Sequence, residues 1–375
     1  MRILFLAPDV SLEDWDGQSV HTLALCRAFR NLGHEVLLLV GRLGSLRPEG
    51  RGVIVEEIRN TGIFSRGNAM QKVRAFSPSI VYERRSTPKL GAFIASKLGL
   101  PYYLEVNGLV KREITQNAHA GHFWKKFRRR RIFSRCARIF VPSAGLADAL
   151  VVAEGINRTV FSVIPNGVDL ALFQPADRTS ARRSLGLPQD LLVATFVGKL
   201  APWQGLETLL AAAAFLRDQP ALRFFIVGKG PLLSSLQESV RTQRLSDKVV
   251  FMGSIPHESV PTILAASDVC LAPFTRARNE EIEISPLKIF EYMAMARPIV
   301  ASDVPGVRAL IHDCGIMIPP DSPAALAASI GELLRNRDAA ELVARRAPEF
   351  LTDCSWEARA RDILETISST RSASA

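Results

Sequence analysis

The chain of 375 residues lacks several features that would place it in a large class of proteins. Its five cysteines are scattered and none lie in a Cys-x-x-Cys pair, which argues against a disulfide framework and against a structural zinc site. No run of 18 apolar residues occurs, so no transmembrane helix is expected. The apolar residues 1–8 are too short for a signal peptide and are interpreted as a first buried strand. The expected location is therefore the cytoplasm.

Familiar cofactor and hydrolase motifs are also missing. Gly228-x-Gly230 has no third glycine of a dinucleotide fingerprint, and neither a Walker A sequence nor a Gly-x-Ser-x-Gly motif occurs. These absences disfavour a dehydrogenase, a P-loop enzyme and a serine hydrolase. The Asp14-Trp15-Asp16 triplet matches the short D-x-D pattern that can hold a divalent metal. Three residues are a weak pattern, and the triplet lies far from the nucleotide candidate described below. His119 and His122 have no third ligand, so no metal site is expected.

Positive charge is concentrated in the first half of the chain. Lys and Arg outnumber Asp and Glu by 25 to 14 in residues 1–175, whereas the counts are 22 and 23 in the rest. This asymmetry suggests an acidic partner, either a membrane surface or nucleic acid. The basic run lacks a recognisable nucleic-acid module, so nucleic acid is not the expected partner.

Residues 125–138 carry eight cations interleaved with Phe127, Ile132 and Phe133, which predicts a basic amphipathic helix. This helix could lie on anionic lipid as a peripheral contact with the inner face of the membrane. It could equally expose a solvated basic face and bury its apolar side in the core, and both interpretations stay open. The candidate membrane residues are Lys125, Lys126, Arg128, Arg129, Arg130 and Arg131.

Strand and helix patterns alternate along the whole chain. Apolar runs typical of buried strands occur in the first half at 3–6, 36–40, 53–55, 79–82, 101–108, 138–143 and 160–164. The second half repeats the pattern at 191–197, 224–227, 249–251, 269–273, 298–301 and 315–318. Strands that alternate with helices form parallel sheets. We therefore predict an α/β protein with two doubly wound, Rossmann-like domains that face each other across a ligand-binding cleft.

The composition also indicates where the domains meet. Residues 173–190 are rich in proline, aspartate and arginine, so the boundary is placed at their start. The expected parts are an N-terminal domain over 1–172 and a C-terminal domain over 173–354. A last helix over 355–367 would pack back on the N-terminal domain, and a Ser/Ala tail over 368–375 would be disordered.

A helix in the C-terminal domain carries a ligand signal. Ser285 followed by Pro286 suits a helix N-terminus, and Arg297-Pro298 ends the helix. A helix N-terminus attracts an anion such as phosphate. Glu291 lies in this apolar helix, where a lone carboxylate needs a partner. Either the two hydroxyls of a ribose or a buried arginine or lysine would satisfy it.

The N-terminal domain offers candidates of its own. Gly17 and Gln18 lie in a polar loop before a helix predicted over 20–32, while Glu105 and Asn107 lie at the end of the strand over 101–108. Loops and strand ends of this kind line the ligand crevice of α/β folds. A flexible surface loop and ordinary loop hydrogen bonds are the alternatives.

Several motifs follow one another in a characteristic order. They are Gly33-His34-Glu35-Val36, residues 164–169 followed by Phe173, Gly228-x-Gly230-Pro231, Ala266-Ser267-Asp268 followed by Pro273, and the E-x7-E pair of Glu283 and Glu291. Together they resemble the retaining glycosyltransferases of family 4 (glycosyl transferases group 1), which have the GT-B fold. The resemblance runs nearly end to end.

The resemblance implies a nucleotide-sugar site in the C-terminal domain and an acceptor site in the N-terminal domain. Glu291 would accept hydrogen bonds from the ribose, Glu283 would hold the donor sugar, and Lys199 would neutralise the leaving diphosphate. The other donor-binding residues would be Gly198, Gln204, Lys229, Ser285, Pro286, Leu287 and Lys288. The acceptor side would comprise Gly17, Gln18, His21, Glu105 and Asn107, and the catalytic residues would be Glu283, Lys199 and Asn107.

Three positions depart from the family pattern. Gln204 stands where a lysine is usual, so Lys199, with Lys288 or Lys229, would carry the positive charge. Gly17-Gln18 replaces a glycine pair, and Asn107 stands where many members place a histidine.

The expected protein is a membrane-associated glycosyltransferase of hexosyltransferase type that acts in polysaccharide biosynthesis. It would move a sugar from a UDP- or GDP-type nucleotide sugar to a hydroxyl of a glycan or lipid-linked acceptor, with no further cofactor. Another GT-B enzyme, such as a sugar-nucleotide epimerase or a phosphorylase, is the first alternative. A non-catalytic, basic nucleic-acid-binding protein is the second.

Overall fold

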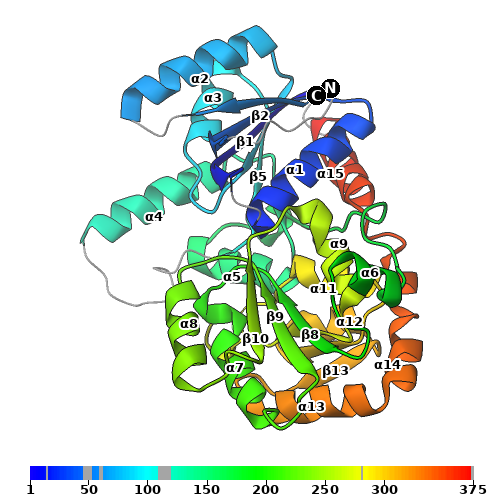
Figure 1. The fold of residues 1–375 in the computed structure, drawn as a ribbon. Helices are drawn as coiled ribbons and strands as arrows, with labels where there is room; N and C mark the ends of the chain where they lie inside the picture. The colour runs from blue at the N-terminus through cyan, green and yellow to red at the C-terminus, as the bar shows by residue number, and fades with distance from the viewer. Residues whose placement is uncertain (14–15, 45–52, 59–61, 109–119, 280–281, 373–375) are drawn as a thin grey trace. The chain divides into compact units, whose positions relative to one another are not determined.

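The computed structural model describes residues 1–13, 16–44, 53–58, 62–108, 120–279 and 282–372 (Figure 1). The chain divides into two compact units. Unit 1 comprises Met1–Asp14, Gln18–Asn166 and Trp356–Ala375, and unit 2 comprises Trp15–Gly17 and Gly167–Ser355. The chain thus passes from unit 1 to unit 2 at 166/167 and returns at 355/356, where the sequence analysis placed the boundaries at 172/173 and 354/355.

Unit 1 is built on a seven-stranded parallel sheet with the strand order β3-β2-β1-β4-β5-β6-β7. Residues Ile3 to Ala7 of the first strand are fully buried, as expected for a strand covered by helices on both faces. The strands are β1 (Arg2–Ser11), β2 (Glu35–Arg42), β3 (Val53–Glu57), β4 (Ile80–Arg84), β5 (Tyr102–Glu105), β6 (Arg138–Val141) and β7 (Phe161–Val163).

Helices connect these strands and cover the sheet. They are α1 (Gly17–Asn31), α2 (Gly62–Phe76), α3 (Leu90–Leu98), α4 (Ala120–Phe133), α5 (Ala144–Glu154), the short 3-10 helix η1 (Arg158–Val160) and α15 (Trp356–Ser372). Local sequence explains their ends. For example, the Ser143 side chain accepts from the Leu146 N–H at the start of α5, and Gly155 ends that helix in the left-handed conformation.

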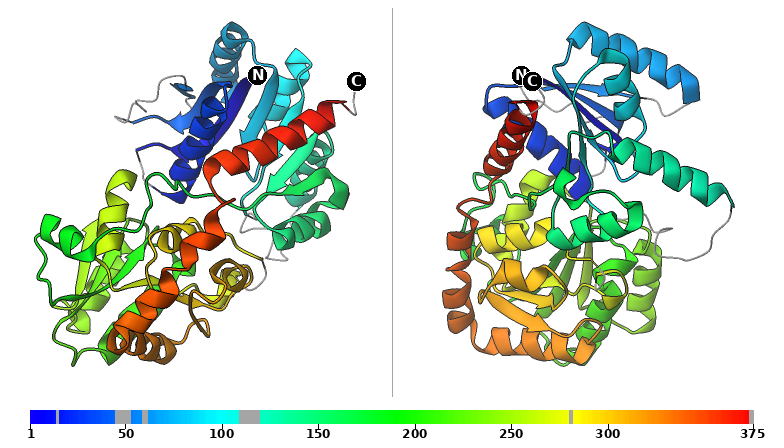
Figure 2. Two further views of the ribbon diagram at one scale, coloured as in Figure 1. Left: turned by 90° about the vertical axis from the view of Figure 1, so that its right-hand side faces the viewer. Right: turned by 180° about the vertical axis from the view of Figure 1, so that it is seen from behind.

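The last helix, α15, belongs to unit 1 (Figure 2). Its Ile367 carbonyl accepts from the Tyr103 hydroxyl at 3.4 Å, and Arg371 lies 3.5 Å from the sulfur of Met1. The prediction of a disordered tail over 368–375 was wrong for residues 368–372, which continue the helix, and residues 373–375 lie outside the described part. Ile363 and Ile367 are buried, and this apolar side holds the helix against the unit.

Unit 2 contains a six-stranded parallel sheet with the order β10-β9-β8-β11-β12-β13. Its strands are β8 (Leu192–Val197), β9 (Leu222–Val227), β10 (Val249–Gly253), β11 (Val269–Ala272), β12 (Ile299–Ser302) and β13 (Gly315–Ile318). All six were predicted from the sequence. With the sheet of unit 1, they confirm the predicted doubly wound α/β class.

Helices pack on both faces of this sheet. One face, which includes Phe196 and Phe224, packs on α7 (Leu206–Phe215), α8 (Leu233–Thr242) and α13 (Pro323–Arg335). The other face, which includes Cys270 and Ala272, packs on α9 (Val260–Ala266), α11 (Leu287–Ala294) and α12 (Val307–Ile311). The remaining elements are α6 (Arg178–Ser184), α10 (Arg276–Asn279), α14 (Arg337–Ala344), η2 (Pro202–Gln204), η3 (His257–Ser259) and η4 (Ala347–Leu351).

In both sheets the strand order reverses once. The reversal lies between β1 and β4 in unit 1 and between β8 and β11 in unit 2. Ligands of doubly wound folds bind outside the carboxyl ends of the strands at such a switch point. In the part of the chain that the structure describes, no helix is both long and apolar enough to cross a membrane.

Candidate functional site

The switch point of unit 2 is held by one tyrosine. β8 and β11 pair only at Ala194 with Val269 and at Thr195 with Cys270. Beyond these pairs the Tyr292 hydroxyl, which comes from α11, accepts from the Val197 N–H at 2.9 Å and donates to the Leu271 carbonyl at 3.3 Å. The second half of α11 is therefore anchored at the carboxyl ends of both strands.

Glycines let the backbone loops approach one another closely at the carboxyl edge of the sheet. Gly198 and Gly228 follow β8 and β9 and have φ angles of 145° and 133°. A Cβ atom on Gly228 would lie 1.9 Å from the Gly198 carbonyl oxygen, and one on Gly198 would lie 2.9 Å from the Lys288 Nζ. A larger residue at either position would displace the loop or the lysine.

Helix α11 begins one residue later than the sequence suggested. Pro286, with φ −80° and ψ 126°, is the N-cap, and no side chain caps the helix. The prediction that Ser285 is the cap was therefore wrong, because proline already fixes the turn into the helix. The helix also ends early, at Ala294 rather than at Arg297. A helix N-terminus without a side-chain cap suits an anion.

Lys288 and Gln204 meet at this helix start. Lys288 is 8% exposed, and its Nζ lies 2.6 Å from the Gln204 Oε1 and 3.7 Å from the centre of the Phe196 ring. Burial lowers the pKa of the Lys288 amine well below its usual value, and the nearby Glu291 charge offsets only part of this. Gln204 of η2 thus holds a lysine that comes from the helix.

Glu291 has a partner that the sequence did not reveal. Its Oε1 lies 2.8 Å from the His257 Nε2 of η3, and the His257 ring lies 5.1 Å from the Phe173 ring. Among the residues that the structure describes, no arginine or lysine forms an ion pair with this carboxylate. Burial alone would lower the pKa of His257, but the hydrogen bond and the charges of Glu291, Glu258 and Asp169 raise it.

The other donor candidates lie around the same strand ends. Lys199 follows β8, is 42% exposed in its side chain, and lies 3.5 Å from Asp16, which clusters with unit 2. Lys229 is exposed after β9, and its carbonyl accepts from the Leu200 N–H at 2.9 Å. The half-buried Glu283 lies beside Gly306, on which a Cβ atom would lie 2.9 Å from the glutamate Cγ.

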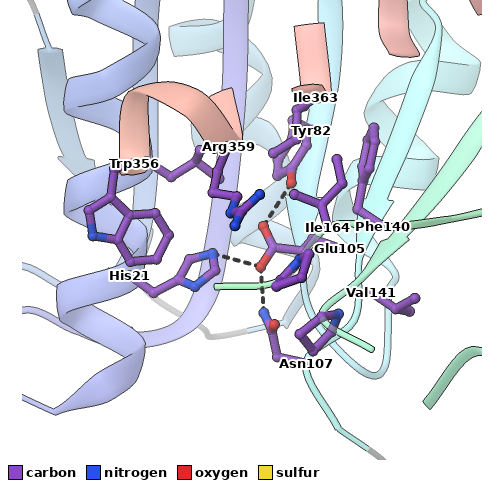
Figure 3. Close-up of a pocket in the computed structure, with 13 residues that line it drawn as sticks. His21, Tyr82, Glu105, Asn107, Phe140, Val141, Ile164, Trp356, Arg359 and Ile363 are labelled. Carbon is purple, nitrogen blue, oxygen red and sulfur yellow. Dashed lines mark hydrogen bonds and ion pairs between the residues drawn. The ribbon is translucent and has the colours of Figure 1, made fainter. Parts of the chain in front are cut away.

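Unit 1 has a small pocket beside the carboxyl ends of β5 and β6, next to α1 and α15 (Figure 3). Glu105 lies at its centre. The pocket brings together three predicted acceptor-side residues, His21, Glu105 and Asn107. It is also lined by Trp356 and Arg359 of α15, which were not among the candidates.

Protein side chains already surround the Glu105 carboxylate. The Tyr82 hydroxyl donates to it at 2.7 Å, Arg84 at 3.2 Å, and the Asn107 amide also donates to it. The His21 Nε2 lies 2.8 Å away. Burial would raise the pKa of Glu105, but His21, Arg84 and Asn107 together hold it well below its usual value. Burial lowers the pKa of His21. Glu105 is therefore an ionised group that protein side chains already hydrogen-bond, and its place on the acceptor side stays a prediction.

Gly17 and Gln18 do not lie in a loop. They are the exposed first residues of α1, which begins three residues earlier than predicted. The shift arises because a glycine can start a helix, and the sequence pattern alone did not mark this N-terminus. Their backbone N–H groups therefore lie at the start of a helix and not in a flexible loop.

The basic run forms α4, but its apolar side chains do not form one exposed stripe. Phe133 is buried in unit 1, whereas Phe127 is 52% exposed. Arg129 is paired with the buried Glu154 of α5, and Arg128, Arg130 and Arg131 are exposed. The side chains of Lys125 and Lys126 lie outside the described residues. The helix thus buries one apolar side chain and exposes another, and contact with a membrane stays a prediction.

Among the described residues, no group of three His, Cys, Asp or Glu side chains is placed to hold a metal ion. Asp14, Trp15 and His119 lie outside the described residues, as does the side chain of His122.

Two family models match the chain. Residues 15–172 match the model described as "Glycosyltransferase Family 4", and residues 192–336 match "Glycosyl transferases group 1". The chain belongs to glycosyltransferase family 4. The two matched segments correspond to the two units, so this assignment confirms the resemblance that the motifs carried.

Named relatives of this family 4 chain are glycosyltransferases. The D-inositol 3-phosphate glycosyltransferase of Nocardia farcinica is 31% identical over 64% of this chain and 54% of its own length. The alpha-D-kanosaminyltransferase of Streptomyces kanamyceticus is 34% identical over 46% of this chain and 44% of its own length. The chain thus spans about half the length of the curated relatives it matches.

Solved structures show the same fold. The sucrose-phosphate synthase of Thermosynechococcus elongatus matches with a TM-score of 0.79 at 19% identity, over all of both chains. Anabaena HepE, solved in complex with UDP and glucose, matches with a TM-score of 0.80 at 20% identity, over 98% of this chain and 100% of that one. The fold of this family 4 chain is therefore GT-B, as predicted.

Three residues of the site were not predicted from the sequence. They are His257, Tyr292, and Phe173 in its contact with His257. One signal for His257 was available. It follows the predicted strand over 249–251 by a few residues, and strand ends are where ligand residues of such folds gather. Tyr292 gave no signal, because only the packed sheet shows what its hydroxyl meets.

Proposed function

We propose that this chain is a retaining glycosyltransferase of hexosyltransferase type. It transfers a sugar from a UDP- or GDP-type nucleotide sugar to a hydroxyl of a glycan or lipid-linked acceptor. The observation that carries the proposal is the arrangement at the switch point of unit 2. There the start of α11, Lys288 and Glu291 converge.

Different residues bind the diphosphate, the ribose and the sugar of the donor. The first N–H groups of α11, around Ser285, Pro286 and Leu287, receive the diphosphate, and the backbone at Gly198 lets it approach. Lys288, Lys199 and Lys229 supply positive charge, and Gln204 holds Lys288 in place. The ribose hydroxyls donate to Glu291, and Glu283 binds hydroxyls of the sugar. The UDP complex of HepE makes uracil the first base to test.

The reaction follows from this placement of charge. The bond between the anomeric carbon and the diphosphate oxygen breaks, and its electron pair remains on the diphosphate. The acceptor oxygen bonds to the anomeric carbon on the face that the diphosphate leaves, and its proton passes to a diphosphate oxygen. Fixed cations and helix N–H groups stabilise the charge that grows on the leaving group, which lowers the barrier.

Unit 1 supplies the acceptor side. The Glu105 carboxylate has donors on both oxygens, so we assign it the role of orienting His21 and Asn107 in place of direct contact with the acceptor. Asn107 and the N-terminal residues Gly17 and Gln18 of α1 are exposed, and we assign them to the acceptor. The name of the inositol phosphate relatives makes a polyhydroxylated acceptor a sensible first probe.

Peripheral membrane contact is part of the proposal. The exposed Arg128, Arg130 and Arg131 of α4 lie near the exposed Phe127, and Val152 on the adjoining α5 is 84% exposed. Basic and apolar side chains together favour anionic lipid surfaces. A lipid-linked acceptor would be reached from such a surface.

A ligand screen followed by a turnover assay tests the function. UDP, GDP and ADP are compared by thermal shift, and one of them is expected to raise the melting temperature. The matching nucleotide sugars are then incubated with the protein, with and without inositol phosphates and simple sugars. Conversion of the donor to another nucleotide sugar without acceptor would indicate an epimerase. No response to any nucleotide would overturn the proposal.

A further inference from the structure

His257 lies where it can control the ribose-binding carboxylate. It begins η3, shortly after β10 ends at Gly253, and its Nε2 lies 2.8 Å from the Glu291 Oε1. Both side chains are largely buried, at 16% and 11% exposure. The contact therefore joins two elements that are 34 residues apart in the chain.

The fold does not depend on this contact to hold α11. The helix is already held by the buried Ile289, Phe290 and Met293 and by the Tyr292 hydroxyl. A buried ion pair is a weak source of stability, because both groups lose water when they come together. Because a pair of this kind adds little stability, we assign it a role in binding.

We infer that His257 is a positioning residue for the donor, which holds the Glu291 carboxylate in the orientation that the ribose hydroxyls require. The inference rests on the proposed function. An ionised carboxylate has two oxygens with about two acceptor sites each. His257 occupies one site on Oε1, so Oε2 and the remaining Oε1 site stay available for the two hydroxyls of a ribose. Because the carboxylate is already oriented, less side-chain freedom is lost when the nucleotide binds.

The imidazole is surrounded by negative charge. Glu291 faces it from α11, Glu258 from η3 and Asp169 from the segment before α6, while the Phe173 ring packs beside it. These carboxylates raise the pKa of His257 above its usual 6.5 despite burial. Lys288, one turn before Glu291, is a second titrating group on the same helix.

The sign of the pH effect follows from this. The imidazolium is present below pH 6.5, and its charge is lost as the pH rises through the raised pKa. The grip on Glu291 weakens in that range. Nucleotide affinity is therefore expected to fall as the pH rises above 6.5, and Lys288 contributes to the same trend.

The test compares three proteins by calorimetric titration with UDP, GDP and ADP between pH 6 and pH 9. His257→Leu is expected to bind the preferred nucleotide about tenfold more weakly than the wild type at pH 6, with a smaller difference at pH 9. His257→Gln keeps an N–H near the Nε2 position and is expected to recover much of the affinity. The pH dependence of nucleotide affinity in His257→Gln should keep the part that arises from Lys288 and lack the part that arises from His257. With a nucleotide sugar, KM is expected to rise in His257→Leu while kcat changes little.

The matched control is His312→Asn, because His312 stacks on Phe350 in the same unit and was not assigned to donor binding. It is expected to behave as the wild type. Melting temperatures show whether each variant is folded. Suppose that Glu291→Gln weakens nucleotide binding, so that the site assignment holds. A folded His257→Leu protein with the wild-type affinity and pH profile would then overturn the inference alone. If no nucleotide binds the wild type, the proposed function itself fails, and the inference with it.

Discussion

The Tyr292 hydroxyl accepts a hydrogen bond from the Val197 N–H at 2.9 Å, at the point where β8 and β11 separate. The same hydroxyl donates to the Leu271 carbonyl of β11. Because the strands no longer pair there, one side chain satisfies backbone groups of both strands and anchors α11 beside them.

Tyr292→Phe is expected to lower the free energy of unfolding by about 1–3 kcal/mol, because a buried donor and acceptor lose their partner while the ring still fills its space. Urea unfolding measures this loss. Tyr103→Phe is the matched control, since the Tyr103 hydroxyl makes only a 3.4 Å contact with Ile367. Equal losses in both variants would contradict a special role for Tyr292.

Glu291→Gln is expected to weaken nucleotide binding about tenfold or more, because a neutral amide accepts weaker hydrogen bonds from the ribose than a carboxylate does. Glu291→Ala should abolish transfer while the fold persists. Calorimetry and a transfer assay measure these effects. Glu238→Gln, an exposed residue of α8, serves as the control. An active, folded Glu291→Ala protein would remove Glu291 from the site.

Lys288→Met is expected to change binding and stability in opposite directions. Nucleotide affinity should fall about tenfold or more, since the diphosphate loses a buried cation. The free energy of unfolding should stay equal or rise, because the buried amine no longer has to be desolvated. Lys97→Met, at an exposed lysine of unit 1, is the control.

An exchange variant tests whether Gln204 and Lys288 act as a pair. Combining Gln204→Lys with Lys288→Gln moves the cation back to the loop and is expected to restore most of the affinity that Lys288→Gln loses. Gln204→Lys alone should destabilise the protein, because two amines would then lie at hydrogen-bond distance. Strictly additive effects in the double-mutant cycle would contradict the pairing.

Glu105→Gln is expected to destabilise unit 1 by about 3 kcal/mol at neutral pH, because Arg84 is left buried without its carboxylate. The folded pKa of Glu105 lies well below the usual 4.5, so its contribution is present above pH 4.5 and is lost as the pH falls. Urea unfolding at several pH values should show the wild type and variant converge in acid. Glu35→Gln, at a surface pair with Arg2, should cost at most about 1 kcal/mol.

Vesicle sedimentation tests the α4 surface. The protein is expected to pellet with phosphatidylserine vesicles at low salt and to be released at high salt, because exposed charges are then screened. Replacing Arg128, Arg130 and Arg131 with glutamine should lower the partition coefficient about a hundredfold. Glutamine at Arg217, Arg241 and Arg244, exposed in unit 2, is the control. Equal losses in both triple variants would indicate that only total charge matters.

Much of the fold could be predicted because its signals are local. The apolar strand runs and the helices between them are written in consecutive residues, and every predicted strand of unit 2 formed. The exact helix starts were less certain. Pro286 rather than Ser285 caps α11, since a proline and a serine side by side offer the chain two ways to begin the same helix. The last residues of α15, 368–372, were missed because serine, threonine and arginine give no apolar pattern.

The sequence by itself determined the two parallel sheets, the family and the residue types that gather at the strand ends. These depend on periodicity and on motif spacing, which are properties of neighbours in the chain. Only the tertiary structure decided that Lys288 meets Gln204, that His257 holds Glu291, and that Glu105 is surrounded by protein donors. Each of these contacts joins distant elements, so its partner and the resulting pKa shift depend on burial and geometry that exist only in the folded unit.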